Sequence, residues 1–562
     1  MPSFQFATLD YVVFIAVMML SALIGIVYAI KSRLGEKAES PEAFLMGDRR
    51  LPLLPVALSL LVSFQSAILI LGTSSEMYTR GTTWWWSTVG IGLSALITCV
   101  LFVPVFYHLR LTSVYQYLEV RFHSRAVRRL GAFFYILVTV MYLSIAIYAP
   151  SVALSAVTPL PLWTLILSAG AVCTFYVSIG GMKAVIWTDA LQAGFMLAGL
   201  AAVAIKGTGE VGGVGRVWQA GRQGSRLIYF ENSVDPFAYM TSWGIIFGQL
   251  YSWLGWYGIN QSSVQRYCSM RTAKQGQLAL LLNIPALFLT MSLVCYCGLV
   301  MYAYFRSCDP LQAGRIQDRD ELLPLFVMEV LGSARGIPGL FIACLYSGTL
   351  RQGLCFHFFV AHDFLKSPMK HATQQQATLV TKLLCLSFGI ISTGLAFLGP
   401  HLGGVLQAAL STMGAINGPL TGMFLLGVIF PWANKKGAIA GALVSASVTV
   451  WLCLGAHVTQ PHAHETLPTS VQGCPQAYNL TAQIPITTST PLAPLQEDWW
   501  RRMYSLSYVL YDFIGISLVL MVAIPVSWIT GWEEVEQNPQ LYHPWLSPIF
   551  LKWIATTKTV EM

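Results

Sequence analysis

The residues that could bind an ion or a small solute lie where an apolar run is interrupted. Residues 51–78 read LPLLPVALSLLVSFQSAILILGTSSEMY, long enough to cross a bilayer because about 20 apolar residues suffice. The middle, Ser63-Phe64-Gln65-Ser66, carries polar side chains, which are tolerated at membrane depth where they face a cavity or a partner. The pattern fits a broken helix that lines a solute site. It also fits a packed helix whose serines bond to their own backbone.

The composition indicates a polytopic membrane protein. Of the 562 residues, 55% are hydrophobic and 10% charged, and apolar runs of about 20 residues recur along the chain. The net charge of +8 comes mostly from Lys and Arg in short loops, which sets topology and is no nucleic-acid signal. No HExxH, GxSxG or P-loop pattern occurs, so a membrane enzyme has little support. We expect a lipid bilayer around the chain and no nucleic-acid partner.

The hydropathy pattern predicts about thirteen membrane spans. They lie roughly at 11–30, 51–78, 84–107, 131–157, 160–179, 187–205, 242–258, 279–304, 339–360, 381–398, 405–430, 437–458 and 506–529. The loops after the first, third, fifth, seventh, ninth and eleventh spans are basic, so they should be cytoplasmic. An odd number of spans then puts the N-terminus outside the cell and the C-terminus in the cytoplasm.

This topology predicts a membrane domain, a long loop within it and a tail after it. The membrane domain covers 1–535 and the predicted cytoplasmic tail 536–562. The Pro- and Thr-rich segment 459–505 is expected to be an extracellular loop, and Asn479 in Asn-Leu-Thr is a glycosylation acceptor there. Cys308 and Cys474 lie in polar loops and are candidates for a disulfide, whereas most other cysteines lie in apolar runs.

Two spans share a feature that suggests an internal repeat. The second is interrupted by polar residues, and the seventh, 242–258, carries four glycines among aromatic residues. Transporters with inverted repeats place broken helices at matching positions of their two halves. Repeat one would then cover about 51–205 and repeat two about 242–430. The alternative is that membrane helices simply contain more Gly than soluble ones.

Several long motifs are similar to those of a known family. They are LPVALSLLVSFQSAILILGTSSEMY, PVFYHLRLTSVYQYLEVRF, GGMKAVIWTDALQ, YGINQSSVQRY, CDPLQAGRI, IPGLFIACLYSGTL and MYSLSYVLY, which are spread from one end of the chain to the other. The chain resembles the solute:sodium symporter family, in the branch of the iodide, monocarboxylate and multivitamin transporters. The resemblance implies an all-α fold with two inverted five-helix repeats, and plasma-membrane symport driven by the sodium gradient.

The resemblance also implies positions for a sodium site. The family's shared site uses backbone carbonyls of its broken first core helix, which match Val62 and Gln65, and a carbonyl of the ninth span, which matches Gly348. Unwound carbonyls are hard oxygen ligands that suit Na⁺. Asp189 matches a carboxylate close to that site, although an Asp at the start of a helix can equally be an N-cap.

A solute pocket is implied in the same way. The matching positions are Ser66, Leu69, Tyr142, Trp253 and Tyr257. Aromatic walls with a few polar groups are what a membrane pocket needs, while any one aromatic could instead belong to the interfacial belt or to helix packing. Leu69 stands where relatives often place a polar residue, which would suit a larger or softer solute.

The ninth span departs from the family pattern. Relatives follow SGTL with two hydroxyl residues that complete the sodium shell, and here Arg351 and Gln352 replace both. The stretch 339–350 gives only about 18 Å of helix, so Arg351 should lie within the membrane. Its guanidinium has only donors, so it cannot ligate Na⁺ but could occupy the site, with Asp189 as counter-ion. Two other interpretations fit the same residues. The local sequence could be damaged and the protein inert, or the Arg351 side chain could extend to the inner membrane surface.

The expected function is therefore secondary transport of a small organic or inorganic anion, with an altered sodium site. A sodium-independent carrier, or a non-transporting sensor that keeps only the fold, is the alternative. The Phe64-Gln65-Ser66 triplet resembles the multivitamin branch, whereas CDPLQAGRI resembles the iodide and monocarboxylate branches. The residues leave the choice of solute open.

Overall fold

The chain folds into packed α-helices. The computed structural model describes residues 6–34, 51–109, 111, 113–177, 182–350, 374–401, 404–462, 465–475, 499–531 and 541–542. Helices, short 3₁₀ turns and connecting loops account for these residues, and no strand occurs among them. The all-α prediction is confirmed.

The helices follow the apolar runs, because a backbone surrounded by lipid must satisfy its own hydrogen bonds. In chain order they are α1 (Thr8–Leu34), α3 (Leu53–Phe64), α4 (Ala67–Arg80), α5 (Ser87–Leu101), α6 (Val103–Leu109), α7 (Gln116–Phe122), α8 (Arg125–Ser155), α9 (Leu162–Val177), α10 (Met182–Val211), α11 (Val214–Gln223), α12 (Ser242–Gly258), α13 (Gln261–Cys268), α14 (Ala273–Phe305), α15 (Leu322–Leu331), α16 (Ile337–Leu350), α18 (Gln374–Ala396), α19 (Val405–Ile429), α20 (Lys435–Thr459), α21 (Trp499–Tyr504) and α22 (Tyr511–Ile529).

Length and hydropathy identify the membrane-crossing helices among the described residues. Seven helices are long and apolar enough to cross a membrane, and the bent pair of α3 and α4 makes an eighth. A described helix also overlaps each span expected from the sequence. The polytopic membrane class is confirmed, while the count of thirteen spans and the two inverted repeats stay predictions.

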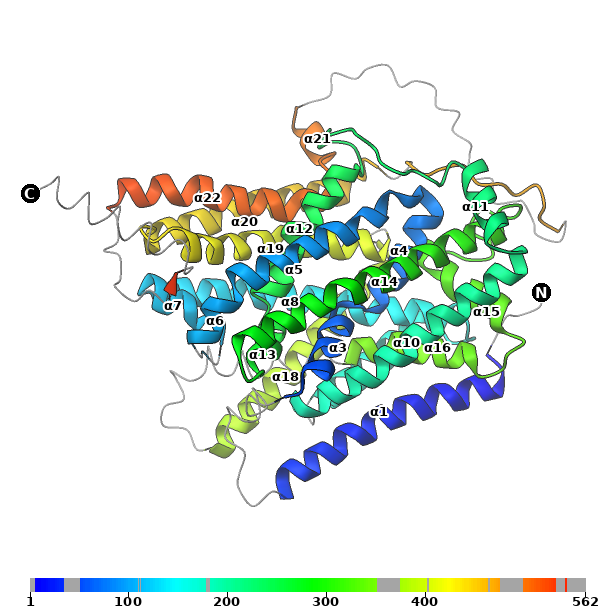
Figure 1. The fold of residues 1–562 in the computed structure, drawn as a ribbon, viewed down its shortest axis with the longest axis horizontal. Helices are drawn as coiled ribbons and strands as arrows, with labels where there is room; N and C mark the ends of the chain where they lie inside the picture. The colour runs from blue at the N-terminus through cyan, green and yellow to red at the C-terminus, as the bar shows by residue number, and fades with distance from the viewer. Residues whose placement is uncertain are drawn as a thin grey trace, which may run out of the picture.

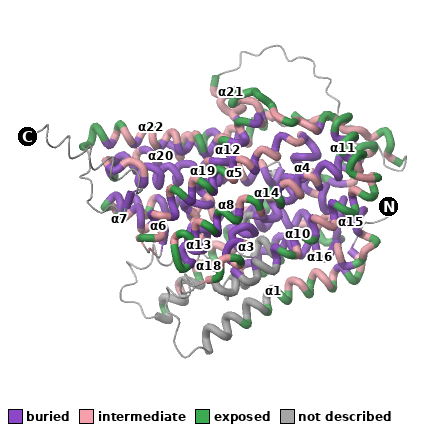
Figure 2. The backbone as a smooth tube through the Cα atoms, viewed as in Figure 1, coloured by how far each residue is buried: buried purple, intermediate pink, exposed green. Residues whose placement is uncertain are grey.

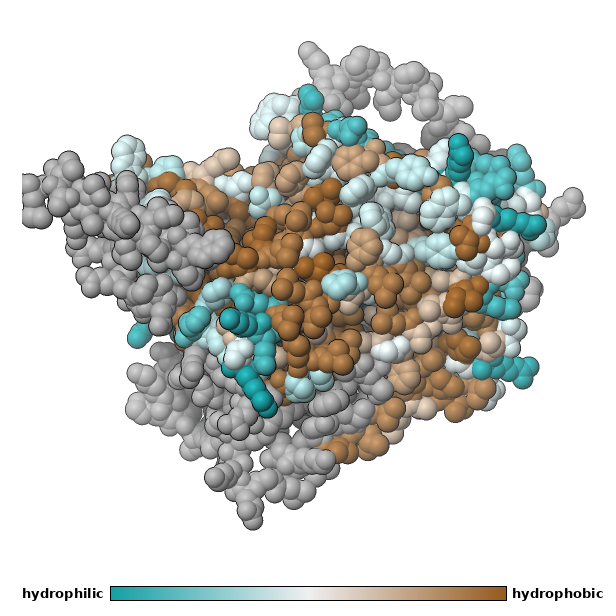
Figure 3. Space-filling view, in the orientation of Figure 1, coloured by the Kyte–Doolittle hydropathy of each residue, from teal (hydrophilic) through white to brown (hydrophobic). Residues whose placement is uncertain are grey.

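The long helices run side by side, and the start of α1 and the end of α22 lie at opposite ends of the molecule (Figure 1). Buried residues make up most of α4, α8 and α19, at the centre of the bundle (Figure 2). A broad apolar surface lies between hydrophilic regions at both ends of these helices (Figure 3). Its exposed side chains include Leu96 of α5, Phe247 of α12 and Phe288 of α14. This is the surface expected to face lipid acyl chains.

A disulfide joins two distant loops at the end of the bundle where α14 and α4 finish. Cys308 is bonded to Cys474, across 166 residues of sequence, which confirms the predicted pairing. Segment 465–475, which we call the outer strap, is tied to the neighbouring helices by backbone bonds as well. The Leu467 N–H donates to Thr79 of α4 at 2.9 Å, and the Asp309 N–H donates to Ser470 at 2.9 Å.

Candidate functional site: a broken helix at the centre of the bundle

The interrupted span is a broken helix. α3 ends at Phe64 and α4 begins at Ala67, and their axes are bent by 56°. Between them Gln65 has φ −84° and ψ 69° and Ser66 is extended, so neither continues the helix. The last carbonyls of α3 and the first N–H groups of α4 therefore lack the i, i+4 partners of a continuous helix. A break of this kind presents carbonyl oxygens to a cation and N–H groups to an anion.

The polar groups at the break are buried. The Gln65 N–H donates to the Val62 carbonyl at 3.1 Å, which leaves one lone pair of that oxygen for a further ligand. Gln65 is 2% exposed, and neither its amide oxygen nor its amide nitrogen has a hydrogen-bond partner among the described residues. Ser66 is buried at the start of α4 and makes no capping bond. A buried amide with no partner costs free energy, so it is a candidate for contact with a bound ion or solute.

The inner half of the broken helix is held by a buried ion pair that the sequence did not reveal. The Arg266 guanidinium of α13 lies 3.4 Å from the Asp189 carboxylate of α10. Ser59 of α3 bridges them: its hydroxyl donates to Asp189 at 2.6 Å and accepts from Arg266 Nε at 2.8 Å. Three elements are thus joined one turn before the break.

These contacts correct one expectation about Asp189. Helix α10 begins at Met182, so Asp189 lies two turns inside it and the N-cap interpretation is wrong. Asp189 forms an ion pair with Arg266, and its expected pairing with Arg351 stays a prediction because Arg351 lies outside the described residues. The sequence signal was the position of Arg266 in the motif YGINQSSVQRY. This motif contains most of α13, a helix that is almost entirely buried.

The aromatic candidates come from α8 and α12. Trp253 and Tyr257 lie one helical turn apart on α12 with ring centroids 5.2 Å apart, and the Trp253 indole donates to Gln249 at 3.0 Å. Tyr142 of α8 has its ring centroid 5.4 Å from that of Trp256, a residue that the sequence analysis did not single out. Leu69 packs against the hydrophobic clusters of both halves of the bundle. The assignment of Ser66, Leu69, Tyr142, Trp253 and Tyr257 to one pocket remains a prediction.

The remaining sequence candidates lie at the edge of the described chain or outside it. Gly348 belongs to the last turn of α16, which packs against α1, α8 and α10. Arg351, Gln352 and Asn479 lie outside the described residues.

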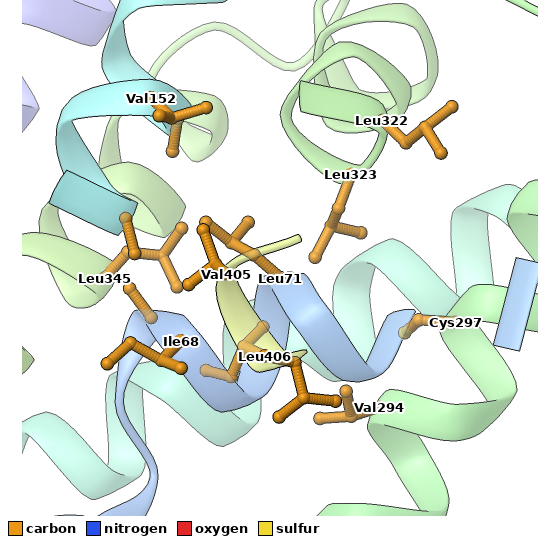
Figure 4. Packing of buried hydrophobic residues seen from close by; sticks show 14 of the residues in the cluster. Ile68, Leu71, Val152, Val294, Cys297, Leu322, Leu323, Leu345, Val405 and Leu406 are labelled. Carbon is orange, nitrogen blue, oxygen red and sulfur yellow. The ribbon is translucent and has the colours of Figure 1, made fainter. Parts of the chain in front are cut away.

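A layer of apolar side chains closes the bundle on the outer side of the break. Ile68 and Leu71 of α4 meet Val405 and Leu406 at the first turn of α19, next to Leu323 of α15 (Figure 4). These side chains are 4% exposed or less. We call Ile68, Leu71, Leu323, Val405 and Leu406 the outer seal. It lies between the break and the end of α4 that the Leu467 N–H contacts, near the Cys308–Cys474 disulfide, and the word outer names this end of the bundle.

Comparison with known proteins agrees with this geometry. A family model described as the sodium:solute symporter family matches residues 44–445, a stretch that includes the broken helix, Asp189 and Arg266. The chain belongs to the sodium:solute symporter family. The resemblance inferred from the motifs is confirmed.

Relatives within this family are named as transporters. Sodium-coupled monocarboxylate transporter 2 of Bos taurus is 40% identical, over 99% of this chain and 90% of that protein. The sodium-dependent multivitamin transporter of Oryctolagus cuniculus is 38% identical, over 96% of this chain and 85% of that protein. This symporter-family chain is therefore a multi-pass membrane transporter of the secondary-active class, not an enzyme.

A solved structure of a Na⁺-coupled sialic acid symporter, in a substrate-bound outward-open state, shares the fold. Its TM-score is 0.72 at 19% identity, and the match covers 95% of this chain and all of that chain. At this identity the match establishes the fold of the symporter-family chain, and the solute must be argued from other observations.

Proposed function

We propose that this symporter-family protein carries small monocarboxylate anions across the plasma membrane. The observation that carries the proposal is the chain-long 40% identity to a transporter named for monocarboxylates, combined with the broken helix at the centre of the bundle. The N-terminus of α4 would attract the carboxylate, because the first N–H groups of a helix favour a negative group.

The Gln65 amide would form hydrogen bonds with the polar groups of the solute. It offers a donor and an acceptor within one planar group, both buried and both without a partner in the structure. A 2-hydroxy monocarboxylate such as lactate has the matching pair, since its carboxylate accepts and its hydroxyl donates. Vitamins with a carboxylate tail, and iodide, are the competing solutes.

We further propose that sodium coupling is altered. The carbonyls of Val62 and Gln65 remain available for a cation at the break, but Arg351 and Gln352 stand where relatives have two hydroxyl residues. An Arg351 side chain at the break would rest on these carbonyls and on the Gln65 amide oxygen. A cationic side chain there would replace Na⁺, not bind it.

Uptake in oocytes tests both parts. Labelled L-lactate, iodide and biotin are offered to cells expressing the protein, in Na⁺ medium and in N-methylglucamine medium. Saturable lactate uptake that unlabelled monocarboxylates compete for supports the proposed solute, whereas uptake of biotin or iodide alone contradicts it. A strict Na⁺ requirement contradicts the altered site. If the site is altered as proposed, the double change Arg351→Ser with Gln352→Thr should create or strengthen Na⁺ dependence.

A non-transporting member is the second candidate, and the loss of both hydroxyl ligands favours it. Such a protein would bind solute without moving it. Surface expression with solute-dependent thermal stabilisation but no uptake of any of the three probes identifies that case.

We also propose that the N-terminus is extracellular and the C-terminus cytoplasmic. The Cys308–Cys474 bond supports this orientation, because disulfides persist in oxidising compartments and both cysteines lie in the loops assigned to the outside. The two chain ends also lie at opposite ends of the bundle (Figure 1).

A further inference from the structure

A buried carboxylate holds the first turn of α19 at the outer seal. Asp320 lies in the short 3₁₀ turn Arg319–Glu321, between α14 and α15, and is 1% exposed. Its Oδ2 accepts the Val405 N–H at 2.7 Å, which is the first N–H of α19. Val405 itself and the next residue, Leu406, belong to the outer seal, as does Leu323, three residues after Asp320 (Figure 4). Asp320 therefore fixes the end of the helix that closes the outer side.

The other oxygen of this carboxylate has no partner. Oδ1 of Asp320 is buried and makes no hydrogen bond, and no Lys, Arg or His forms an ion pair with Asp320 among the described residues. A buried ionised carboxylate without a counter-charge is costly, whereas a protonated one needs no counter-charge. A proton on Oδ1 leaves Oδ2 free to keep its bond to α19.

The charged groups around Asp320 favour the protonated form. On its own turn, Asp318 accepts the Asp320 N–H at 3.2 Å and Glu321 is a second carboxylate, against a single cation, Arg319. From α4 the charge of Glu76 also acts on Asp320, although Arg80 of the same helix pairs with Glu76 at 2.9 Å; from α8, Tyr148 donates to Asp318 at 3.4 Å. The side chains that α15 and α19 contribute to this contact, Leu322 and Val405 among them, are apolar.

The pKa of Asp320 is raised by these surroundings. Burial, and next the charge of Asp318, raise the pKa of Asp320 from 3.8 to about 7, while the Val405 N–H and Arg319 act in the opposite direction. With the seal open, water would reach the carboxylate and its pKa would return toward the ordinary value. The closed state thus binds the proton more tightly. Its stabilisation by the proton is greatest at low pH and is lost as the pH rises through about 7.

We propose that Asp320 is an extracellular proton site that controls the outer seal. Protonation from outside stabilises the closed seal, and opening of the seal releases the proton to the outside. Between pH 8 and pH 6 the ratio of closed to open states should rise about tenfold, given the two pKa values. The proposal rests on the proposed orientation and on the chain being a carrier with an outer barrier, and it stands whichever solute is transported.

Labelling of a cysteine beneath the seal tests the proposal. Ser66→Cys places a thiol at the break, and a membrane-impermeant methanethiosulfonate added to intact cells reports how often the outer seal opens. Asp320→Asn keeps an acceptor for the Val405 N–H but cannot ionise, so it mimics the protonated site at every pH. The ratio of the labelling rate with Asp320 to that with Asp320→Asn cancels the pH dependence of the thiol itself. The same chain without Ser66→Cys gives the background from native cysteines.

The ratio is expected to be about ten times larger at pH 8 than at pH 6, because Asp320→Asn does not respond to pH in this range. Glu231→Gln, which removes an exposed carboxylate of the same face of the protein, should leave the labelling rate unchanged at both pH values. A ratio for Asp320→Asn that is the same at pH 6 and pH 8 overturns the proposal. If that variant does not reach the surface, Asp318→Asn replaces it. Loss of the neighbouring charge should move the pH dependence of labelling to lower pH, and an unmoved profile overturns the proposal equally.

Discussion

At the scale of single residues, two buried polar groups behave in opposite ways. The Asp189 carboxylate is fully paired, with Arg266 and Ser59 around it. The Gln65 amide, at the break after α3, has no hydrogen-bond partner within the described part of the chain. A paired buried group stabilises the packing of the helices, whereas an unpaired one lowers the free energy of unfolding. Substitution of Asp189 should therefore reduce stability, and substitution of Gln65 should reduce uptake.

Asp189→Asn should destabilise the protein by about 3–5 kcal/mol, because it leaves the Arg266 guanidinium buried without a counter-charge. The measurement is thermal unfolding of the detergent-solubilised protein, with a double-mutant cycle through Arg266→Gln. Glu119→Gln is the matched control, since its pair with Arg128 is partly exposed and should cost at most about 1 kcal/mol. Equal losses for the two pairs would show that Asp189 and Arg266 do not depend on each other.

Gln65→Leu should abolish uptake. It should leave the free energy of unfolding unchanged or raise it by about 1 kcal/mol, because the amide that it removes has no hydrogen-bond partner among the described residues. Gln249→Leu is the control at a paired glutamine: it strands the Trp253 indole N–H and should cost about 1–3 kcal/mol. Uptake and thermal unfolding are measured on both variants. A stability loss for Gln65→Leu as large as that for Gln249→Leu would place the Gln65 amide in the structural framework.

At the scale of elements, the outer seal depends on how closely α4 and α19 approach. Gly72 of α4 faces Leu406, and a Cβ built at Gly72 would lie 2.4 Å from the Leu406 Cβ. Contacts this short do not occur, so only a glycine lets the two helices meet here. The seal is thus a property of backbone approach as much as of apolar surface.

Gly72→Ala should push the first turn of α19 away from α4 and hold the seal open. We expect faster labelling of Ser66→Cys from outside and a stability loss of about 1–3 kcal/mol from overpacking. Gly194→Ala, in α10, is the control because no atom lies within 4 Å of its new Cβ. It should neither speed the labelling of Ser66→Cys nor lower the stability of the protein. Unchanged labelling in Gly72→Ala would mean that α4 and α19 do not form the outer barrier.

The same elements show what the sequence could and could not predict. The break in the second span was predictable because Ser63, Gln65 and Ser66 interrupt an apolar run locally. The ion pair of Asp189 was not, since it joins residues 77 positions apart and Arg266 looks like any loop arginine of a cytoplasmic side. Asp320 was missed for the same reason: its partner Val405 is 85 positions away, and a carboxylate in a polar loop gives no sign of burial.

At the scale of the whole molecule, two long-range observations together support the proposed orientation. The disulfide between residues 308 and 474 favours an oxidising compartment at one end of the bundle. The start of α1 and the end of α22 lie at opposite ends of the bundle, as expected for an odd number of crossings (Figure 1). An epitope at the N-terminus should then be detected by antibody on intact cells, and one at the C-terminus only after permeabilisation. Asn479→Gln should remove a glycan and shift the mobility of the protein on a gel, whereas Asn260→Gln, at an acceptor pattern assigned to the cytoplasmic side, should not. Detection of both epitopes on the same side would require an even number of crossings, and with it a reassignment of the loops that carry the basic residues.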